Sequence, residues 1–142
     1  MHFMKGLQAI LKKAEAHCTA KKIEPEALLK ARLFPDMFDL TKQVQLVTDF
    51  AKGPASRLAG VAVPSYADEE KGFDELQARL QKTIDYLATL KPEQFSDAAT
   101  RTITIKVGGK AMSFAGGEYL MGYAMPNFYF HLTTAYNSLR HH

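Results

Sequence analysis

Residues 126–140 read PNFYFHLTTAYNSLR and belong to the most aromatic part of the chain. No side chain from Tyr119 to Leu139 carries a formal charge. An uncharged helical segment of this kind is typical of a helix on which the other elements of a protein pack. His131 lies in its middle and is the one residue there with obvious acid–base or metal-binding chemistry. We therefore expect this segment to be the central helix of the fold.

Three further segments, residues 2–20, 36–59 and 69–90, repeat apolar side chains at the spacing of one helical face. Asp36 is the expected N-cap of the second of these helices. Pro25 begins a short helical turn between the first and the second. The apolar stripe of the first helix consists of Phe3, Leu7, Ile10, Leu11, Ala14 and Cys18.

Two prolines interrupt these helical patterns. Pro54 should clash with the carbonyl four residues before it, which predicts one kinked helix closed by Gly60, with a break at Lys52 as the alternative. Pro126 predicts a kink or a division in the last helix, which follows Gly116-Gly117.

Residues 102–107 alternate polar and apolar side chains, which is the period of a β-strand. A second short strand, residues 110–114, follows Gly108-Gly109, so the pair predicts a hairpin with a two-glycine turn. The same glycines precede a lysine, as in a phosphate-binding loop, but such a loop requires a helix directly after it. The hairpin turn is the better interpretation.

These elements predict an all-α fold, a four-helix bundle with a small β-hairpin between the third and fourth helices. The second and third helices are joined by an extended connection that includes residues 61–67. At about ten residues it is long enough to cross the bundle, so the helices need not pack in sequence order.

The chain has 142 residues, a length that fits a single domain over residues 1–142. Its net charge is +3. Its lysines and arginines form no dense patch, so we expect no nucleic-acid partner. Cys18 is the only cysteine and lies on an apolar stripe, where a buried, unreactive thiol is expected.

No secretory pattern is visible at the start of the chain, which favours a cytoplasmic protein. Residues 119–139 are long enough to span a membrane, but they include a proline, a histidine and several amide and hydroxyl side chains. A helix buried in a bundle is therefore the better interpretation, and we expect no membrane association.

His131 has two interpretations. Its helical face is mostly apolar, so the imidazole is expected to be buried or to line a cavity. It is then either a neutral ring whose nitrogens are satisfied by neighbours, or a metal ligand or general base in the bundle core. The remaining histidines, at positions 2, 17, 141 and 142, are weaker candidates.

Gln43 and Asp49 place polar groups beside the apolar stripe of the second helix. An inward carboxylate needs a partner, so a salt bridge of Asp49 with Arg57 or Lys52 is one interpretation. A polar pocket shared by Gln43, Asp49 and His131 is the alternative. Asn127 and Tyr136 are further candidates for lining such a pocket.

Several strings together resemble a bacterial and fungal family of unknown function within the DinB/YfiT-like superfamily. They are RLFPDM (32–37), QV (43–44), DFAKG (49–53), RLAG (57–60), PNFYFH (126–131), TAY (134–136) and LRH (139–141). The resemblance covers nearly the whole chain. It implies a four-helix bundle with a long crossover, often dimeric through helix faces.

The superfamily often binds a divalent metal, nickel or zinc, on three histidines, one from the second helix and two from the last helix four residues apart. Some members catalyse transfer reactions with bacillithiol or mycothiol. In this chain residues 36–58 contain no histidine, and Ala135 stands four residues after His131. The resemblance therefore implies the fold, while only His131 matches a ligand position.

Two functional hypotheses follow. The first is a homodimeric bundle that binds a small molecule in a polar pocket near His131, without catalysis. The second is a metal- or thiol-dependent transferase in which His131 is a metal ligand or a base. The missing ligands favour the first.

Overall fold

The computed structural model describes residues 1–142, and most of the chain is helical. Four helices are long: α1 (His2–Lys21), α3 (Leu40–Ala59), α4 (Phe73–Thr89) and α6 (Met125–His141). The shorter elements are α2 (Pro25–Leu29), a 3-10 turn (Pro92–Phe95), strands β1 (Thr102–Val107) and β2 (Lys110–Ala115), helix α5 (Gly116–Tyr119) and a π-helical turn (Leu120–Ala124). No helix combines the length and the hydropathy that a membrane-spanning segment requires.

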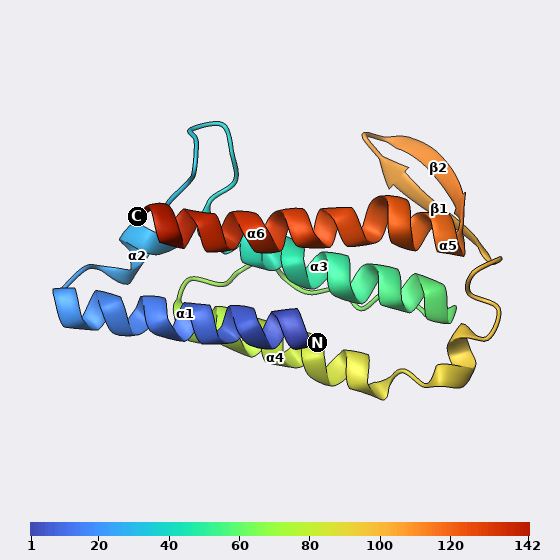
Figure 1. The fold of residues 1–142 in the computed structure, drawn as a ribbon, viewed down its shortest axis with the longest axis horizontal. Helices are drawn as coiled ribbons and strands as arrows, with labels where there is room; N and C mark the ends of the chain where they lie inside the picture. The colour runs from blue at the N-terminus through green and yellow to red at the C-terminus, as the bar shows by residue number, and fades with distance from the viewer.

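The long helices do not pack in sequence order. α1 and α3 each pack against α4 and α6, so α1 and α3 lie diagonally across the bundle (Figure 1). α3 and α4 run in the same direction, and residues 60–72 therefore return along the bundle to join them (Figure 1). We call residues 60–72 the crossover. α1 begins near the middle of the molecule and leaves one half of the bundle uncovered on its side (Figure 1).

The core of the bundle follows the predicted stripes, with one correction in α1. Met4 is buried, with 1% of its surface exposed, whereas Phe3 is 48% exposed. The buried face of α1 is thus rotated by one position at its start, and the Phe3 ring instead packs edge-on against Tyr129 with centroids 5.3 Å apart. Cys18 is buried, as predicted. Other core residues are Leu7, Leu11, Leu40, Val44, Val47, Phe73, Leu76, Leu80, Ile84 and Ala135.

α3 begins four residues later than the predicted cap at Asp36. Asp39 is the N-cap, and its carboxylate accepts a hydrogen bond of 2.9 Å from the backbone N–H of Lys42. Both aspartates suit a cap chemically, so the sequence did not distinguish them. The C-terminal end is as predicted: Gly60 has a left-handed φ of 75° and closes the helix.

The two prolines have different effects. Pro54 lies inside α3, which continues as one helix to Ala59, so the alternative of a break at Lys52 is wrong. Pro126 stands in the first turn of α6, and the turn before it is π-helical. A wider turn removes the conflict between the proline ring and the preceding carbonyls. The helix is therefore divided into α5, the π-helical turn and α6, but these continue in one direction (Figure 1).

The hairpin pairs β1 and β2 in antiparallel register, with Val107 opposite Lys110. Gly108 and Gly109 both have positive φ, 58° and 81°, which is the requirement of a type I′ turn. Ile103 and Ile105 are buried in a second, smaller core with Leu58, Tyr119 and Ala124. The hairpin thereby closes over the C-terminal end of α3.

Candidate functional site

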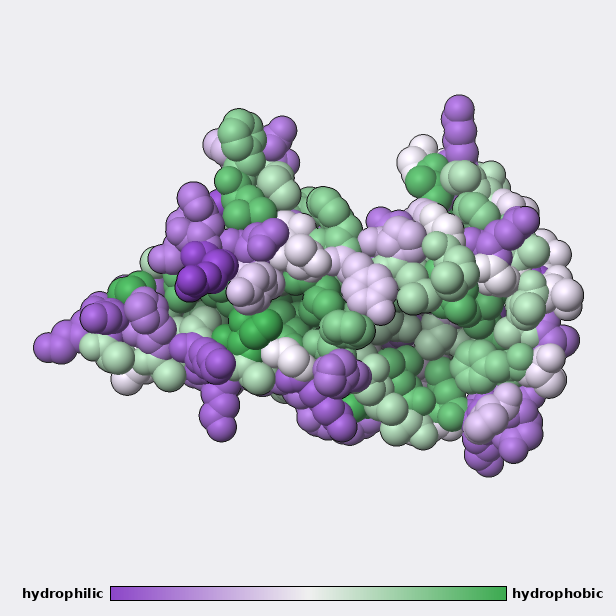
Figure 2. Space-filling model, viewed as in Figure 1, coloured by the Kyte–Doolittle hydropathy of each residue, from purple (hydrophilic) through white to green (hydrophobic).

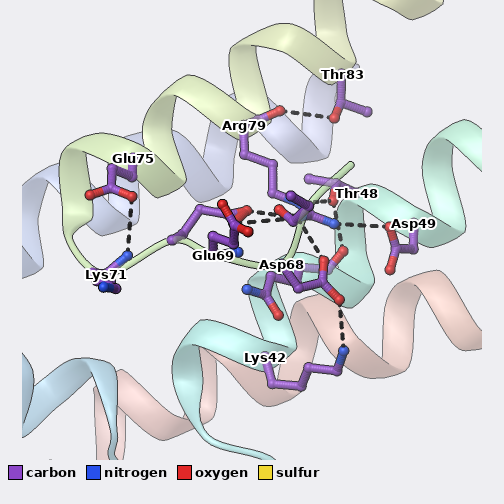
Figure 3. A network of polar contacts seen from close by, with 12 residues as sticks. Lys42, Thr48, Asp49, Asp68, Glu69, Lys71, Glu75, Arg79 and Thr83 are labelled. Carbon is purple, nitrogen blue, oxygen red and sulfur yellow. Dashed lines mark hydrogen bonds and ion pairs between the residues drawn. The ribbon is translucent and has the colours of Figure 1, made fainter. Parts of the chain in front are cut away.

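A buried arginine ties three segments of the chain together (Figure 3). Arg79 extends from α4, and only 4% of its side-chain surface is exposed. Its Nη1 donates to Asp68 at 2.9 Å and to Glu70 at 2.7 Å, both in the crossover. Its Nη2 donates to Asp49 of α3 at 3.0 Å, and its Nε donates to the Thr48 hydroxyl at 2.7 Å. We call these five residues the Arg79 network.

The electrostatics of the Arg79 network favour the charged forms. Burial opposes the charge of Arg79, but hydrogen bonds and charges from Glu70, Asp68 and Asp49 outweigh it and raise the pKa of the guanidinium. Burial likewise opposes the charge of Asp68, yet hydrogen bonds from Lys42 and Arg79 lower the pKa of that carboxyl. The network therefore holds the crossover against α3 and α4 by ion pairs, three of which converge on Arg79.

The crossover forms one wall of a cleft of about 590 Å³. α3 forms the floor, and β1, α5 and the π-helical turn complete the walls. Four aromatic side chains, three cations and two carboxylates line it: Phe50, Tyr66, Tyr119 and Tyr123; Lys52, Arg57 and Lys106; Asp49 and Asp68. The cleft thus combines aromatic surface with converging charge.

Tyr66 is the centre of the crossover wall. Its ring lies 4.8 Å from the Lys52 ammonium, 5.4 Å from the Arg79 guanidinium and 4.4 Å from the Lys82 ammonium. Lys52 also donates to the backbone carbonyl of Pro64 at 2.9 Å. Cation–π contacts of this kind favour a fixed ring orientation, so this wall of the cleft is preorganised.

Arg57 differs from the other cations of the cleft. Its Nη1 donates to the hydroxyl of Tyr119 at 3.1 Å, and no carboxylate lies within ion-pair distance of it. Tyr119 is fully buried, and burial raises the pKa of its hydroxyl although the bond from Arg57 opposes that shift. Arg57 is therefore a partly buried cation whose partner is a neutral phenol.

His131 lies behind the cleft. Its ring is buried, and Nδ1 is 2.8 Å from Oε1 of Gln43 on α3. Because an amide oxygen only accepts, Nδ1 carries a proton. Burial lowers the pKa of the imidazole and so favours the neutral ring, with Nε2 unprotonated. The ring of Phe50 stacks on one face of the His131 imidazole, with centroids 5.5 Å apart. Phe50 also lines the cleft, so it separates His131 from that space.

The whole chain, residues 1–142, matches the model of a family described as a domain of unknown function (DUF1993). The chain belongs to the DUF1993 family. It is also similar to a solved structure, the crystal structure of a DinB family member protein from Shewanella denitrificans. The two are 39% identical with a TM-score of 0.88, over 99% of this chain and 79% of that one. This confirms the predicted resemblance, and no curated protein matches the chain.

In this DUF1993 domain the predicted site residues fall into separate places. Gln43 and His131 are hydrogen-bonded, whereas Asp49 faces Arg79 and lies 3.4 Å from Lys52. Asn127 of α6 donates to the carbonyl of Tyr123 in the preceding π-helical turn, at 2.8 Å. Tyr136 is 46% exposed and lines a different hollow, formed by α1, α2 and the end of α6.

Five residues of the site were not predicted from the sequence: Thr48, Tyr66, Asp68, Glu70 and Arg79. The signal for Arg79 was present, since it stands three residues after Leu76 on the apolar stripe of α4, at an inward position. Glu70 was predicted to lie in the first turn of that helix, but α4 begins at Phe73. The crossover therefore keeps Glu70 free to reach Arg79.

The metal site that the superfamily implies does not fit the DUF1993 chain. No group of three histidine, cysteine, aspartate or glutamate side chains is placed to hold a metal ion. The one core histidine, His131, is bonded to Gln43 and covered by Phe50. Asp49, the carboxylate that was predicted to share a pocket with His131, is instead paired with Arg79 and Lys52. This donor set does not resemble a three-ligand zinc site.

His131 should make the stability of the domain depend on pH. Burial lowers its pKa below the ordinary value. The unfolded chain binds that proton at about pH 6.5, so below this pH it holds more protons than the folded state. The free energy of unfolding should therefore fall between pH 7 and pH 5, and His131→Gln should remove that part of the slope. Urea titrations at pH 7, 6 and 5 test this, and parallel profiles of parent and variant would contradict it.

Proposed function

We propose that this domain binds a small organic molecule in the cleft between α3, the crossover and β1. The observation that carries the proposal is the cleft itself, about 590 Å³ with aromatic walls and converging charged groups. Ligand sites are commonly hollows of roughly 300–1,000 Å³ with a few placed polar groups. The Arg79 network supports the proposal because it holds the crossover wall in place without a ligand.

A binding role is favoured over catalysis by the state of the titratable groups. Asp49 and Asp68 of the cleft are engaged by Arg79, and Lys52 contacts Asp49 and the Pro64 carbonyl. His131 is separated from the cleft by Phe50. A general base needs proton-accepting capacity that is not already engaged, whereas these carboxylates are held in ion pairs and His131 is covered by Phe50. The metal- or thiol-dependent transferase has no specific support.

The test is a fragment screen followed by nuclear magnetic resonance with ¹⁵N-labelled protein. Binders should shift the amide signals of residues 46–57, 63–68 and 105–106. Ser65 lines the cleft, so Ser65→Trp should fill it and abolish those shifts. Ser96 is exposed outside the cleft, and Ser96→Trp is the matched control. Fragments that bind only elsewhere, or none at all, would contradict the proposal.

We further propose that the long helices form the DinB-like four-helix bundle with a long crossover, and that it is a homodimer. Apolar surface gathers beyond the start of α1 (Figure 2), where a groove of about 360 Å³ lies between α1, α3 and α6. Tyr129, which lines the groove, and Phe3, which packs on Tyr129, are 37% and 48% exposed. Contiguous apolar surface of this kind marks interfaces. Sedimentation equilibrium should give a dimer, and a monomer at all concentrations would contradict this.

A further inference from the structure

We infer, on the basis of the proposed ligand cleft, that its ligand is an aromatic carboxylate anchored by Arg57, and that Gly53 positions this arginine. A guanidinium carries five N–H donors, and only one hydrogen bond of Arg57 is made within the protein. A partly buried cation without a counter-ion is unfavourable. An anion entering the cleft would supply the missing partner.

The charges around the cleft leave Arg57 free for such a ligand. Three carboxylates, those of Asp49, Asp68 and Glu70, are matched by three cations, those of Arg79, Lys52 and Lys42. No carboxylate is left over to neutralise Arg57 or to repel an anion. Lys106, the other unpaired cation of the cleft, is exposed on β1 and solvated.

The chemistry of the site selects the class of anion. The planar fork of an arginine matches the two oxygens of a carboxylate. One inward cation balances a monoanion better than a phosphate, which carries close to two charges near neutral pH. The adjacent walls are aromatic, with Tyr119, Tyr123 and Phe50 in ring-to-ring contact at 5.8–5.9 Å. Aromatic rings favour offset or edge contacts with another ring, so an aromatic body suits this wall.

Gly53 gives the Arg57 guanidinium the space that it occupies. Gly53 is four residues before Arg57, on the same face of α3. A Cβ at position 53 would lie 2.9 Å from Nη1 of Arg57, closer than real contacts allow. The guanidinium therefore lies across the helix backbone at the glycine and reaches Tyr119 from there. Alanine favours a helix interior over glycine, so Gly53→Ala should displace the arginine without weakening the helix.

The experiment uses 2-naphthoate and its neutral isostere 2-naphthamide as probes, titrated into ¹⁵N-labelled full-length protein at low salt. Naphthoate should shift the cleft amides, and naphthamide should bind at least tenfold more weakly. Arg57→Gln should weaken naphthoate binding by about tenfold or more, the usual effect of losing a charged hydrogen-bond partner. Arg57→Lys should be intermediate. Arg140→Gln, an exposed arginine on α6, is the matched control and should change nothing.

Gly53→Ala tests the positioning role of Gly53. It should weaken the binding of naphthoate several-fold, while the melting temperature of the protein stays the same or rises. Unchanged affinity in this variant would overturn the positioning role of Gly53. Equal binding of naphthamide and naphthoate at the cleft would overturn the carboxylate inference and leave the proposed function standing. If naphthoate fails but other fragments of the screen bind there, the inference alone is overturned. If nothing binds there, the proposed function fails with it.

Discussion

Replacing Arg79 with methionine is expected to lower the free energy of unfolding by about 3–5 kcal/mol, the usual cost of removing one partner from a buried ion pair. The guanidinium is 4% exposed and contacts three carboxylates, of which Glu70 is 10% exposed. If Arg79 is removed, the negative charges of Glu70, Asp49 and Asp68 repel one another and lose their main positive partner. Urea titration followed by circular dichroism measures the loss.

The control for Arg79→Met is Arg140→Met, which removes an exposed arginine and should change the free energy of unfolding by less than about 0.5 kcal/mol. The acid response provides a second readout. Arg79 helps to lower the pKa of Asp68, so the parent gains stability above the ordinary carboxyl pKa and loses it as pH falls through the lowered value. The difference in the free energy of unfolding between parent and variant should therefore become smaller at acid pH. A constant difference down to pH 2 would mean that the carboxylates do not mediate the effect.

Replacing Gly116 with alanine should be the second most damaging change, with an expected loss of about 3 kcal/mol from overpacking. A Cβ on Gly116 would lie 1.7 Å from the carbonyl oxygen of Ala98 and 2.9 Å from its carbonyl carbon. Both are backbone atoms, so no side-chain rotation relieves the overlap. The segment before β1 or the start of α5 would have to move, and the small core around Tyr119 would open. Thermal unfolding measures the effect.

The neighbouring glycine provides a matched control for Gly116→Ala. A Cβ on Gly117 would lie 3.7 Å from the carbonyl oxygen of Ala99, an ordinary van der Waals distance. Gly117→Ala should therefore leave stability unchanged or raise it slightly, because alanine favours the helix. Similar melting temperatures for the two variants would show that the chain relaxes easily at residue 98.

Local rules predicted the elements of this fold better than their ends. The apolar period of Leu76, Leu80 and Ile84 predicts a helix whatever surrounds it, and Gly108-Gly109 permits the positive φ angles of the hairpin turn. The start of α3 was different. Asp36 and Asp39 are equivalent as caps, and the choice between them depends on tertiary contacts such as the hydrogen bond from the Leu40 N–H to the Ala31 carbonyl.

The candidate site was less predictable because its partners come from different elements. Asp49 was recognised as an inward carboxylate, with Arg57 or Lys52 of its own helix as the expected partner. Lys52 does lie 3.4 Å from it, but Arg57 does not pair with it. The closer partner, Arg79 at 3.0 Å, comes from α4, 30 residues away. Which residues meet across two helices depends on how far one helix is shifted along the other. The periodicity of a sequence carries no information about this shift. The crossover residues Tyr66 and Asp68 show no periodicity at all.

The diagonal placement of α1 and α3 affects how the chain folds during its synthesis. Until residues 125–141 have left the ribosome, α1 and α3 have only α4 as a common neighbour. The face of α3 that carries Gln43 and Phe50 then has no α6 to cover it. Until then a nascent chain would expose this partly apolar stripe to chaperones. The domain is therefore expected to complete its folding only after residues 125–141 have left the ribosome.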